Sequence, residues 1–303
     1  MRPGPYPVTL RQLQYVVAVA DAKSFRRAAE RCHVSQPSLS AQIAEVERAL
    51  DVRLFERGRR GVLVTAAGAA VVEAARRVLL EVDDLVETAR RVDPLSGTLR
   101  IGVIPTIGPY LLPDVDPALR ATFPKLELFW REDKTETLVR LVGRGELDAA
   151  LLALEADLGD LDHELVVEDP FLLAAAPSHP LAAQKGVVRM EQLRGEDVLL
   201  LDEGHCFREQ ALDLCARAGA HEMGFRATSL STLTQMVAGG SGVTLLPRTA
   251  AGVENRRGLL ALRAFADPAP HRTIVLAFRR KTALEEPLRR LAHEMRAALV
   301  ASA

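Results

Sequence analysis

Two cysteines nine positions apart, Cys206 and Cys215, carry the side chains with the clearest covalent chemistry in this chain of 303 residues. An apolar run ends at Leu201, Gly204 follows, and helical spacing then predicts a helix that begins at Cys206. A thiol at a helix N-terminus lies at the positive end of the helix dipole, which favours the thiolate form that oxidants attack. Cys206 is therefore a candidate peroxidatic residue, whereas Cys215, among apolar residues, is expected to be buried and less reactive.

The spacing of this pair also predicts what oxidation would do to the fold. Nine helical residues rise about 13 Å, whereas a disulfide needs its two Cα atoms within about 7 Å. A bond between Cys206 and Cys215 would therefore require the helix to unwind, which supplies the two-state element that a redox switch needs. The simpler alternative is that both cysteines are inert, small apolar residues.

Metal binding is less favoured, because Cys206, Cys215 and the neighbouring His205 do not have the spacing of a zinc site. The third cysteine, Cys32, stands beside His33 and is expected to be a core thiol. We therefore expect no metal, and the redox chemistry of a thiol pair needs no organic cofactor.

Composition indicates a folded protein of about two domains, at roughly 150 residues each. Hydrophobic residues make up 48% and charged residues 26%. No apolar run approaches the roughly 18 residues of a membrane span, and the first residues lack the apolar core of a signal peptide. Few cysteines in odd number argue against a secreted disulfide scaffold. These features favour a cytoplasmic protein that does not bind a membrane.

Charge is distributed unevenly along the chain, although the formal net charge is only -1. Residues 1–66 carry a net charge of +5 and the remaining residues carry -6. A basic head on an acidic body suggests a module that binds a polyanion. A solvated basic face is the alternative.

Helical spacing predicts three helices in the basic segment, over 8–21, 25–31 and 36–50. Ser24 and Ser35 are expected to cap the second and third helices, with Pro37 in the first turn of the third. Its buried stripe is predicted to be Leu39, Ile43, Val46 and Leu50.

The exposed face of the third helix is predicted to carry amides and hydroxyls rather than charges, which suits the reading of base edges in a DNA major groove. The residues of this face are Ser35, Gln36, Pro37, Ser38 and Gln42. Two short strands then flank a basic turn, a wing for phosphates or the minor groove, that carries Arg57, Arg59 and Arg60. A small helical bundle with a basic hairpin is the alternative interpretation.

These residues resemble the winged helix-turn-helix of LysR-type transcriptional regulators. The likeness lies in Phe25–Ala29, Val34–Ile43, Leu54–Arg57, and Leu63, Thr65 and Gly68. The resemblance implies a DNA-binding domain over residues 8–65 that recognises promoter DNA.

A long helix is predicted over residues 66–93, with Thr65 as its cap and a hinge at 94–98. Its apolar positions alternate steps of four and three, which is typical of a coiled-coil seam. The seam consists of Val71, Ala75, Val78, Val82, Leu85, Ala89 and Val92. We expect the helix to dimerise the chain and set the spacing of two DNA heads; packing against its own body is the alternative.

Residues 99–303 alternate strands and helices, which predicts an α/β domain whose first three strands form a parallel sheet. Strands are expected at 99–104, 126–131, 147–152, 165–175, 197–201, 225–228, 242–246, 259–263 and 272–278. Helices are expected at 109–122, 136–143, 206–217, 230–238 and 283–300. The last strand and helix should return to the first sheet, giving lobe I (99–168 and 269–303) and lobe II (169–268) with a cleft between them. This order resembles the two-lobed, periplasmic-binding-protein-like effector domain of LysR-type regulators, so the predicted fold class is multi-domain: an all-α winged helix-turn-helix with a linker helix, then this α/β domain.

The cysteine segment resembles the hydrogen-peroxide-sensing members of the LysR-type family, and the likeness extends over nearly the whole chain from about residue 8. It is carried by Gly204–Ala211, Cys215, Ala218–Ala220, Ile104–Pro113 and Phe225–Leu230. The resemblance implies that Cys206 is the peroxidatic and Cys215 the resolving cysteine of a redox-active pair. It also implies a peroxide pocket shaped by Thr106, Thr135, Gly204 and His205, with Arg272 near the reactive thiol.

We therefore expect a peroxide-responsive transcription factor, an activator or repressor of antioxidant genes, and not an enzyme. Its expected partners are promoter DNA, hydrogen peroxide as the signal, further copies of itself in a homodimer or homotetramer, RNA polymerase and a cellular dithiol reductant. Two alternatives remain open: a LysR-type regulator that answers a small metabolite in the interlobe cleft with inert cysteines, and a thiol peroxidase with an accessory DNA head.

Overall fold

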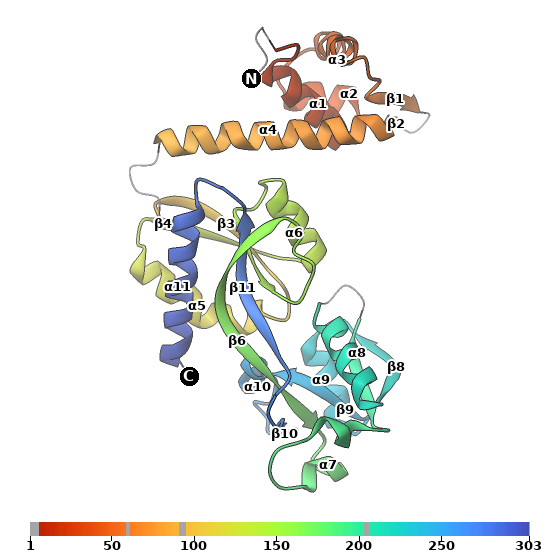
Figure 1. The fold of residues 1–303 in the computed structure, drawn as a ribbon, viewed down its shortest axis with the longest axis vertical. Coiled ribbons are helices and arrows are strands. Elements are labelled where there is room, and N and C mark those ends of the chain that lie inside the picture. Colours follow the sequence, from red (N-terminus) through yellow and green to blue (C-terminus); the bar gives the residue numbers. More distant parts are fainter. Residues whose placement is uncertain (1–5, 59–60, 91–94, 203–205, 303) are drawn as a thin grey trace. The chain divides into compact units, whose positions relative to one another are not determined.

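The computed structural model describes residues 6–58, 61–90, 95–202 and 206–302, and the chain divides into two compact units, residues 1–90 and 91–303. Figure 1 shows both units as ribbons. For Arg57, Cys206 and residues 58, 84, 87–90 and 302 the backbone alone is described.

The first unit is built on three helices, α1 (Leu10–Ala22), α2 (Phe25–Arg31) and α3 (Gln36–Leu50), as the apolar spacing predicts. Their apolar faces share one core, which includes Val16, Val19, Ala28, Leu39, Ile43 and Val46. The predicted caps of α2 and α3 are confirmed: the hydroxyl of Ser24 accepts the N–H of Arg27, and that of Ser35 accepts the N–H of Ser38.

The predicted wing is an antiparallel pair of strands, β1 (Phe55–Gly58) and β2 (Gly61–Val64). Glu47 of α3 fixes the start of the wing, because its Oε1 accepts the N–H groups of Leu54 at 2.7 Å and Phe55 at 3.2 Å. The wing is therefore held at a defined place beside α3.

The long helix α4 (Ala66–Arg90) begins as predicted, with the hydroxyl of Thr65 accepting the N–H of Gly68 at 2.8 Å. Its first turns pack on α1, where Ala75 is buried and Arg76 pairs with Asp21. Further along the predicted seam, Leu85 is 68% exposed. Two seam positions fall outside the description, namely the side chain of Ala89 and the whole of Val92.

The second unit contains one mixed sheet in the order β4-β3-β5-β11-β6-β9-β7-β8, with β10 paired to β6. The strands β3 (Gly97–Val103), β4 (Leu126–Glu132) and β5 (Ala149–Ala153) are parallel, as predicted. Of the predicted hinge 94–98, Pro94 lies outside the described residues and Gly97 already belongs to β3, because its N–H donates to the carbonyl of Lys125.

Two long strands, β6 (Leu161–Ala175) and β11 (His271–Arg279), pair with each other over residues 161–170 and 271–279 in the middle of the sheet (Figure 1). They are antiparallel, and β11 is also antiparallel to β5, because it carries the chain back from the second group of strands to the first. The predicted return of the last strand and helix to the first sheet is confirmed by this pairing.

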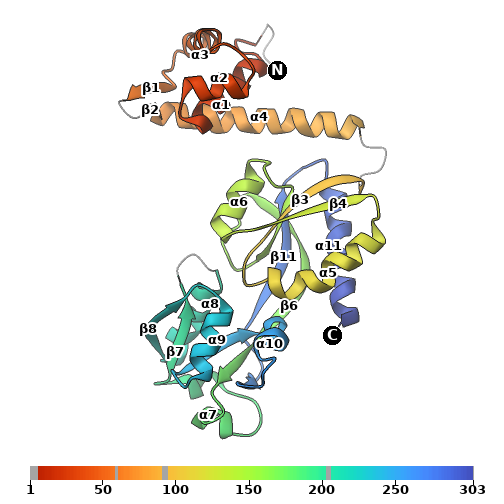
Figure 2. The same cartoon turned by 180° about the vertical axis from the view of Figure 1, so that it is seen from behind.

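We use lobe I for the part built on β3–β5 and lobe II for the part built on β7–β10. The helices of lobe I are α5 (Gly108–Thr122), α6 (Thr135–Gly143) and α11 (Glu285–Ser302). The strands of lobe II are β7 (Asp197–Leu201), β8 (His221–Ala227), β9 (Val243–Pro247) and β10 (Ala261–Ala264). Its longer helices are α8 (Cys206–Ala218) and α9 (Leu230–Ala238), visible from behind in Figure 2.

Three short elements of this unit lack a sequence signal strong enough to predict them: α7 (Pro180–Ala183), the 3-10 helix η1 (Met190–Leu193) and α10 (Arg248–Glu254). Each spans one or two turns, too few for a helical period to emerge.

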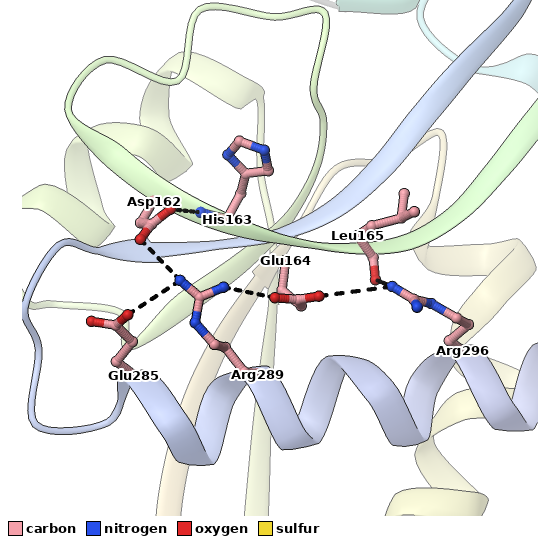
Figure 3. A network of polar contacts seen from close by, with 7 residues as sticks. All are labelled: Asp162, His163, Glu164, Leu165, Glu285, Arg289 and Arg296. Carbon is pink, nitrogen blue, oxygen red and sulfur yellow. Dashed lines mark hydrogen bonds and ion pairs between the residues drawn. The ribbon is translucent and has the colours of Figure 1, made fainter.

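Polar contacts fasten α11 along the lobe I half of β6 (Figure 3). The guanidinium of Arg289 reaches Glu164 at 2.7 Å, Asp162 at 3.1 Å and Glu285 at 3.2 Å, and Arg296 donates to the carbonyl of Leu165. The start of β6 is thereby anchored on α11. Among the described residues, the helices are all too short or too polar to cross a membrane.

Candidate functional site

Helix α8 begins at Cys206 and runs without interruption to Ala218, so both cysteines of the predicted pair lie on it. It starts after the carboxyl end of β7 and is followed by Gly219, whose φ of +71° is in the left-handed region that glycine accepts readily. The predicted helix is confirmed at both ends. The side chain of Cys206, and Gly204 and His205 altogether, lie outside the described residues.

Cys215 is a free thiol that is only 3% exposed. Burial, and secondarily the charge of Glu222, raise the pKa of this thiol from 9.0 to about 11. Cys215 is therefore a protonated thiol at neutral pH.

Arg272 of β11 and Asp169 of β6 form a fully buried ion pair at the point where the two strands pass between the lobes. The guanidinium of Arg272 donates to Oδ2 of Asp169 at 3.0 Å, to the hydroxyl of Thr106 at 3.0 Å and to the Thr106 carbonyl at 2.9 Å. Asp169 in turn accepts the N–H and the hydroxyl of Thr249, at 3.0 and 2.8 Å. All three guanidinium nitrogens of Arg272 and both carboxylate oxygens of Asp169 therefore form hydrogen bonds.

Thr106 and Thr135 follow the carboxyl ends of β3 and β4, two neighbouring parallel strands. Both are buried, at 3% and 8% exposure. The hydroxyl of Thr106 is bound to Arg272, whereas the buried hydroxyl of Thr135 has no hydrogen-bond partner among the described residues. A buried hydroxyl without a partner is costly unless something polar occupies the space beside it.

The structure brings some of the predicted pocket residues together and leaves others apart. Arg272 and Thr106 are in direct contact, and Thr135 lies at the same edge of the sheet without a bond to either. In the part of the chain that the structure describes, no cluster of three metal-ligating side chains is found.

A cavity of about 980 Å³ lies against α8, and Glu155, Arg194, Gln210 and His271 are among its lining residues. Thr106, Thr135 and Arg272 do not line it. The cavity is therefore lined by residues other than the described members of the predicted peroxide pocket.

Sequence reasoning did not identify Asp169, although a signal for it exists. Asp169 alternates with Phe171 and Leu173 on the inward face of β6, so period-two spacing places an acid in the core. It also missed Arg208 of α8, which is 6% exposed and pairs with Glu222 of β8 at 2.7 Å.

In the first unit, the predicted groove residues Ser35, Gln36, Pro37 and Ser38 are exposed at the start of α3. Gln42 is only partly exposed and donates to Glu45 at 3.2 Å, which orients its amide. Of the wing, Arg57 belongs to β1 and its side chain is not described, and Arg59 and Arg60 lie outside the described residues.

Comparison with known protein families assigns both units. Residues 10–69 match the bacterial regulatory helix-turn-helix protein family of LysR, and residues 93–300 match the LysR substrate binding domain. The chain belongs to the LysR family, and is a DNA-binding transcriptional regulator rather than an enzyme.

Two relatives match the chain over nearly its full length. The chain is 45% identical over 292 residues to the DNA-binding transcriptional dual regulator OxyR of Escherichia coli K12, covering 96% of this chain and 95% of the relative. It is 43% identical over 288 residues to the hydrogen peroxide-inducible genes activator of Haemophilus influenzae, covering 94% and 95%.

Solved structures of OxyR proteins also resemble this chain. A full-length OxyR cysteine-to-aspartate variant from Pseudomonas aeruginosa matches with a TM-score of 0.79 at 35% identity, covering 96% of both chains. A cysteine variant of Corynebacterium glutamicum OxyR with hydrogen peroxide bound matches with a TM-score of 0.66 at 33% identity, covering 99% of this chain and 96% of that one.

The buried ion pair generates a prediction for stability. Asp169→Asn should lower the free energy of unfolding of the second unit by about 3–5 kcal/mol, because it leaves the charge of Arg272 buried without a counter-ion. Asp162→Asn, on the same strand but in the partly exposed network of Figure 3, should cost less than about 1 kcal/mol. Urea unfolding, followed by the fluorescence of Trp130, the one tryptophan, measures the unfolding free energy of both variants. Equal losses in the two variants would contradict the special role of the buried Asp169–Arg272 pair.

The raised pKa of Cys215 predicts a pH dependence of stability. Below the unfolded value of 9.0 the thiol is protonated in both states, but between pH 9 and about 11 the unfolded chain loses the proton first. The reduced protein should therefore lose about 2–3 kcal/mol of unfolding free energy as the pH rises through this window. Cys215→Ala should show a shallower slope in urea unfolding under dithiothreitol, and parallel slopes would refute the prediction.

Proposed function

We propose that this LysR-family regulator senses hydrogen peroxide through Cys206 and Cys215 and changes its binding to promoter DNA when the two form a disulfide. The observation that carries the proposal is the position of both cysteines on one continuous helix, in a chain 45% identical to OxyR over nearly its full length. That helix cannot accommodate the disulfide, so oxidation has to change the fold.

The proposed chemistry has two steps. The Cys206 thiolate attacks one peroxide oxygen, the O–O bond breaks, and the sulfur becomes a sulfenic acid while the other oxygen leaves as hydroxide and takes a proton to form water. The Cys215 thiol then attacks this sulfur, a second water leaves, and a disulfide forms. Two thiols of a cellular reductant return the pair to the dithiol form by exchange.

In this proposal, the groups around Thr106 prepare the peroxide. The fixed charge of Arg272 favours the thiolate and stabilises the departing hydroxide, while Thr106 and Thr135 hydrogen-bond a small neutral ligand. The unpartnered hydroxyl of Thr135 supports this role, since a polar ligand would satisfy it. Gly204 and His205 complete the proposed pocket beside Cys206.

The proposed assembly uses the exposed half of α4. Leu85 and Val78 lie on the predicted seam and are exposed in the single chain, so a second copy would bury them. We propose a homodimer or homotetramer that sets two DNA heads (8–65) on their half-sites, acts in the cytoplasm where the DNA is, and engages RNA polymerase. Residues 66–93 would link each head to the sensing domain, whose lobes are proposed as 99–168 with 269–303, and 169–268.

A second candidate function is a response to a metabolite, with the cysteines inert. The cavity of about 980 Å³ beside α8 favours it, because its volume suits a small organic ligand. The two candidates differ in whether the response requires Cys206.

Thiol mapping tests the proposed function. After micromolar peroxide, tryptic peptides should show a Cys206–Cys215 crosslink with the loss of two hydrogens. Cys206→Ser should lose the change in promoter binding but keep DNA binding, whereas Cys32→Ser should respond like the parent chain. Free thiols after peroxide, or a normal response of Cys206→Ser, would rule the proposal out and favour the metabolite.

The DNA head has its own test. Replacing Gln36 and Ser38 with alanine should lower the preference for the promoter over unrelated duplex by about 1–3 kcal/mol, because base contacts are lost. Replacing Arg59 and Arg60 with alanine should weaken binding to every sequence and reduce the slope of log K against log salt by about 2. Fluorescence anisotropy over a salt series measures both, with Arg257→Ala as a control in the second unit. Unchanged preference and slope would refute the groove and wing assignments.

A further inference from the structure

Helix α8 is fastened to its neighbours directly after Cys206. Phe207 is 1% exposed and packs edge-on against Phe171 of β6, with ring centroids 5.2 Å apart. Arg208, the next residue, points inward as well, and its side chain is 8% exposed. The first turn of the helix therefore carries two buried attachments, one apolar and one charged.

The guanidinium of Arg208 connects the strand before α8 to the strand after it. It donates to the carbonyl of Leu201, the last residue of β7, at 3.0 Å, and to Oε1 of Glu222 in β8 at 2.7 Å. The same carboxylate lies 3.8 Å from Nε of Arg226, which is more exposed. Arg208 thus joins three elements through a buried, charge-assisted contact.

The disulfide cannot form while this contact holds α8 in place. Arg208 lies inside the segment between the two cysteines, whose Cα atoms must approach from about 13 Å to within about 7 Å. That approach removes helical turns from the segment, and with them the position from which Arg208 reaches both Leu201 and Glu222. The contact is a property of the dithiol form.

We propose that Arg208 is a positioning residue that holds α8 in the helical dithiol form, and that its ion pair with Glu222 sets how readily the Cys206–Cys215 disulfide forms. This inference rests on the proposed redox function. An interaction present in only one of two states shifts the equilibrium toward that state by its own free energy. Weakening the pair should therefore favour the disulfide.

The test is a redox titration of the full chain in buffers of reduced and oxidised glutathione at pH 7, with the disulfide fraction read by mass spectrometry. Two thiols of the protein are oxidised as one oxidised glutathione is reduced to two thiols. Glu222→Gln should raise the equilibrium constant for disulfide formation about tenfold, which is about 30 mV toward more negative potential for two electrons. Because pH 7 is far below the Cys215 pKa of about 11, loss of the Glu222 charge does not act through ionisation of that thiol.

Asp213→Asn is the matched control. Asp213 pairs with Arg217 at 2.5 Å on the same helix, but both side chains are more than half exposed. Its removal should leave the equilibrium constant within about twofold of the parent chain, since exposed pairs within one helix contribute little. A shift as large as that of Glu222→Gln would overturn the inference.

Unfolding separates positioning from general stability. Glu222→Gln should lower the urea midpoint of the dithiol form and leave that of the disulfide form unchanged; an equal loss in both forms would overturn the inference. Arg208→Lys, whose single ammonium cannot hold both partners, should shift the redox equilibrium in the same direction, and it decides the question if Glu222→Gln does not fold. If the parent chain forms no disulfide in any buffer, the proposed function fails; if it does and both variants titrate like it, this inference alone fails.

Discussion

A guanidinium and a carboxylate without solvent contact, those of Arg272 and Asp169, face each other across β11 and β6. Removing two such charges from water costs several kcal/mol for each ion, and close geometry offsets this only when further hydrogen bonds satisfy both groups. Thr106 supplies two oxygens to the guanidinium, and Thr249 supplies two donors to the carboxylate. The pair therefore constrains four chain segments at once, and the loop that carries Thr106 depends on it.

This constraint explains how a small, weakly binding molecule could meet a fixed site. Arg272 cannot change rotamer without leaving its charge unpaired in the core, so its position does not adapt to a ligand. Preorganised charge of this kind stabilises developing negative charge without reorganisation. Thr135 differs, because its buried hydroxyl has no hydrogen-bond partner among the described residues.

Local sequence patterns predicted the helices and helix caps, because these depend on residues close together in the sequence. The helix that carries both cysteines, the serine caps of α2 and α3 and the threonine that begins α4 all follow from spacing and capping chemistry within a few residues. Contacts between distant segments were not predictable in this way. Asp169 and Arg272 are 103 positions apart, and Arg208 and Glu222 belong to different elements, so their pairing follows only from the strand order. The sheet was predicted as parallel only where strands and helices alternate, and β11 runs against both of its neighbours because it returns between lobes.

The dependence of α8 on contacts with distant segments also explains why this helix suits a reversible switch. A helix of 13 residues is marginal on its own in water, so its helical state depends on attachments to the rest of the protein. Those attachments include Phe207 against Phe171, Arg208 between β7 and β8, the hydrogen bond from Gln210 to Glu155, and Ala211 and Cys215 in the core. A helix held more firmly would keep the cysteines apart in the presence of oxidant, and a helix held less firmly would form the disulfide in a reducing compartment. The strength of these contacts therefore has to match the redox conditions in which the protein works.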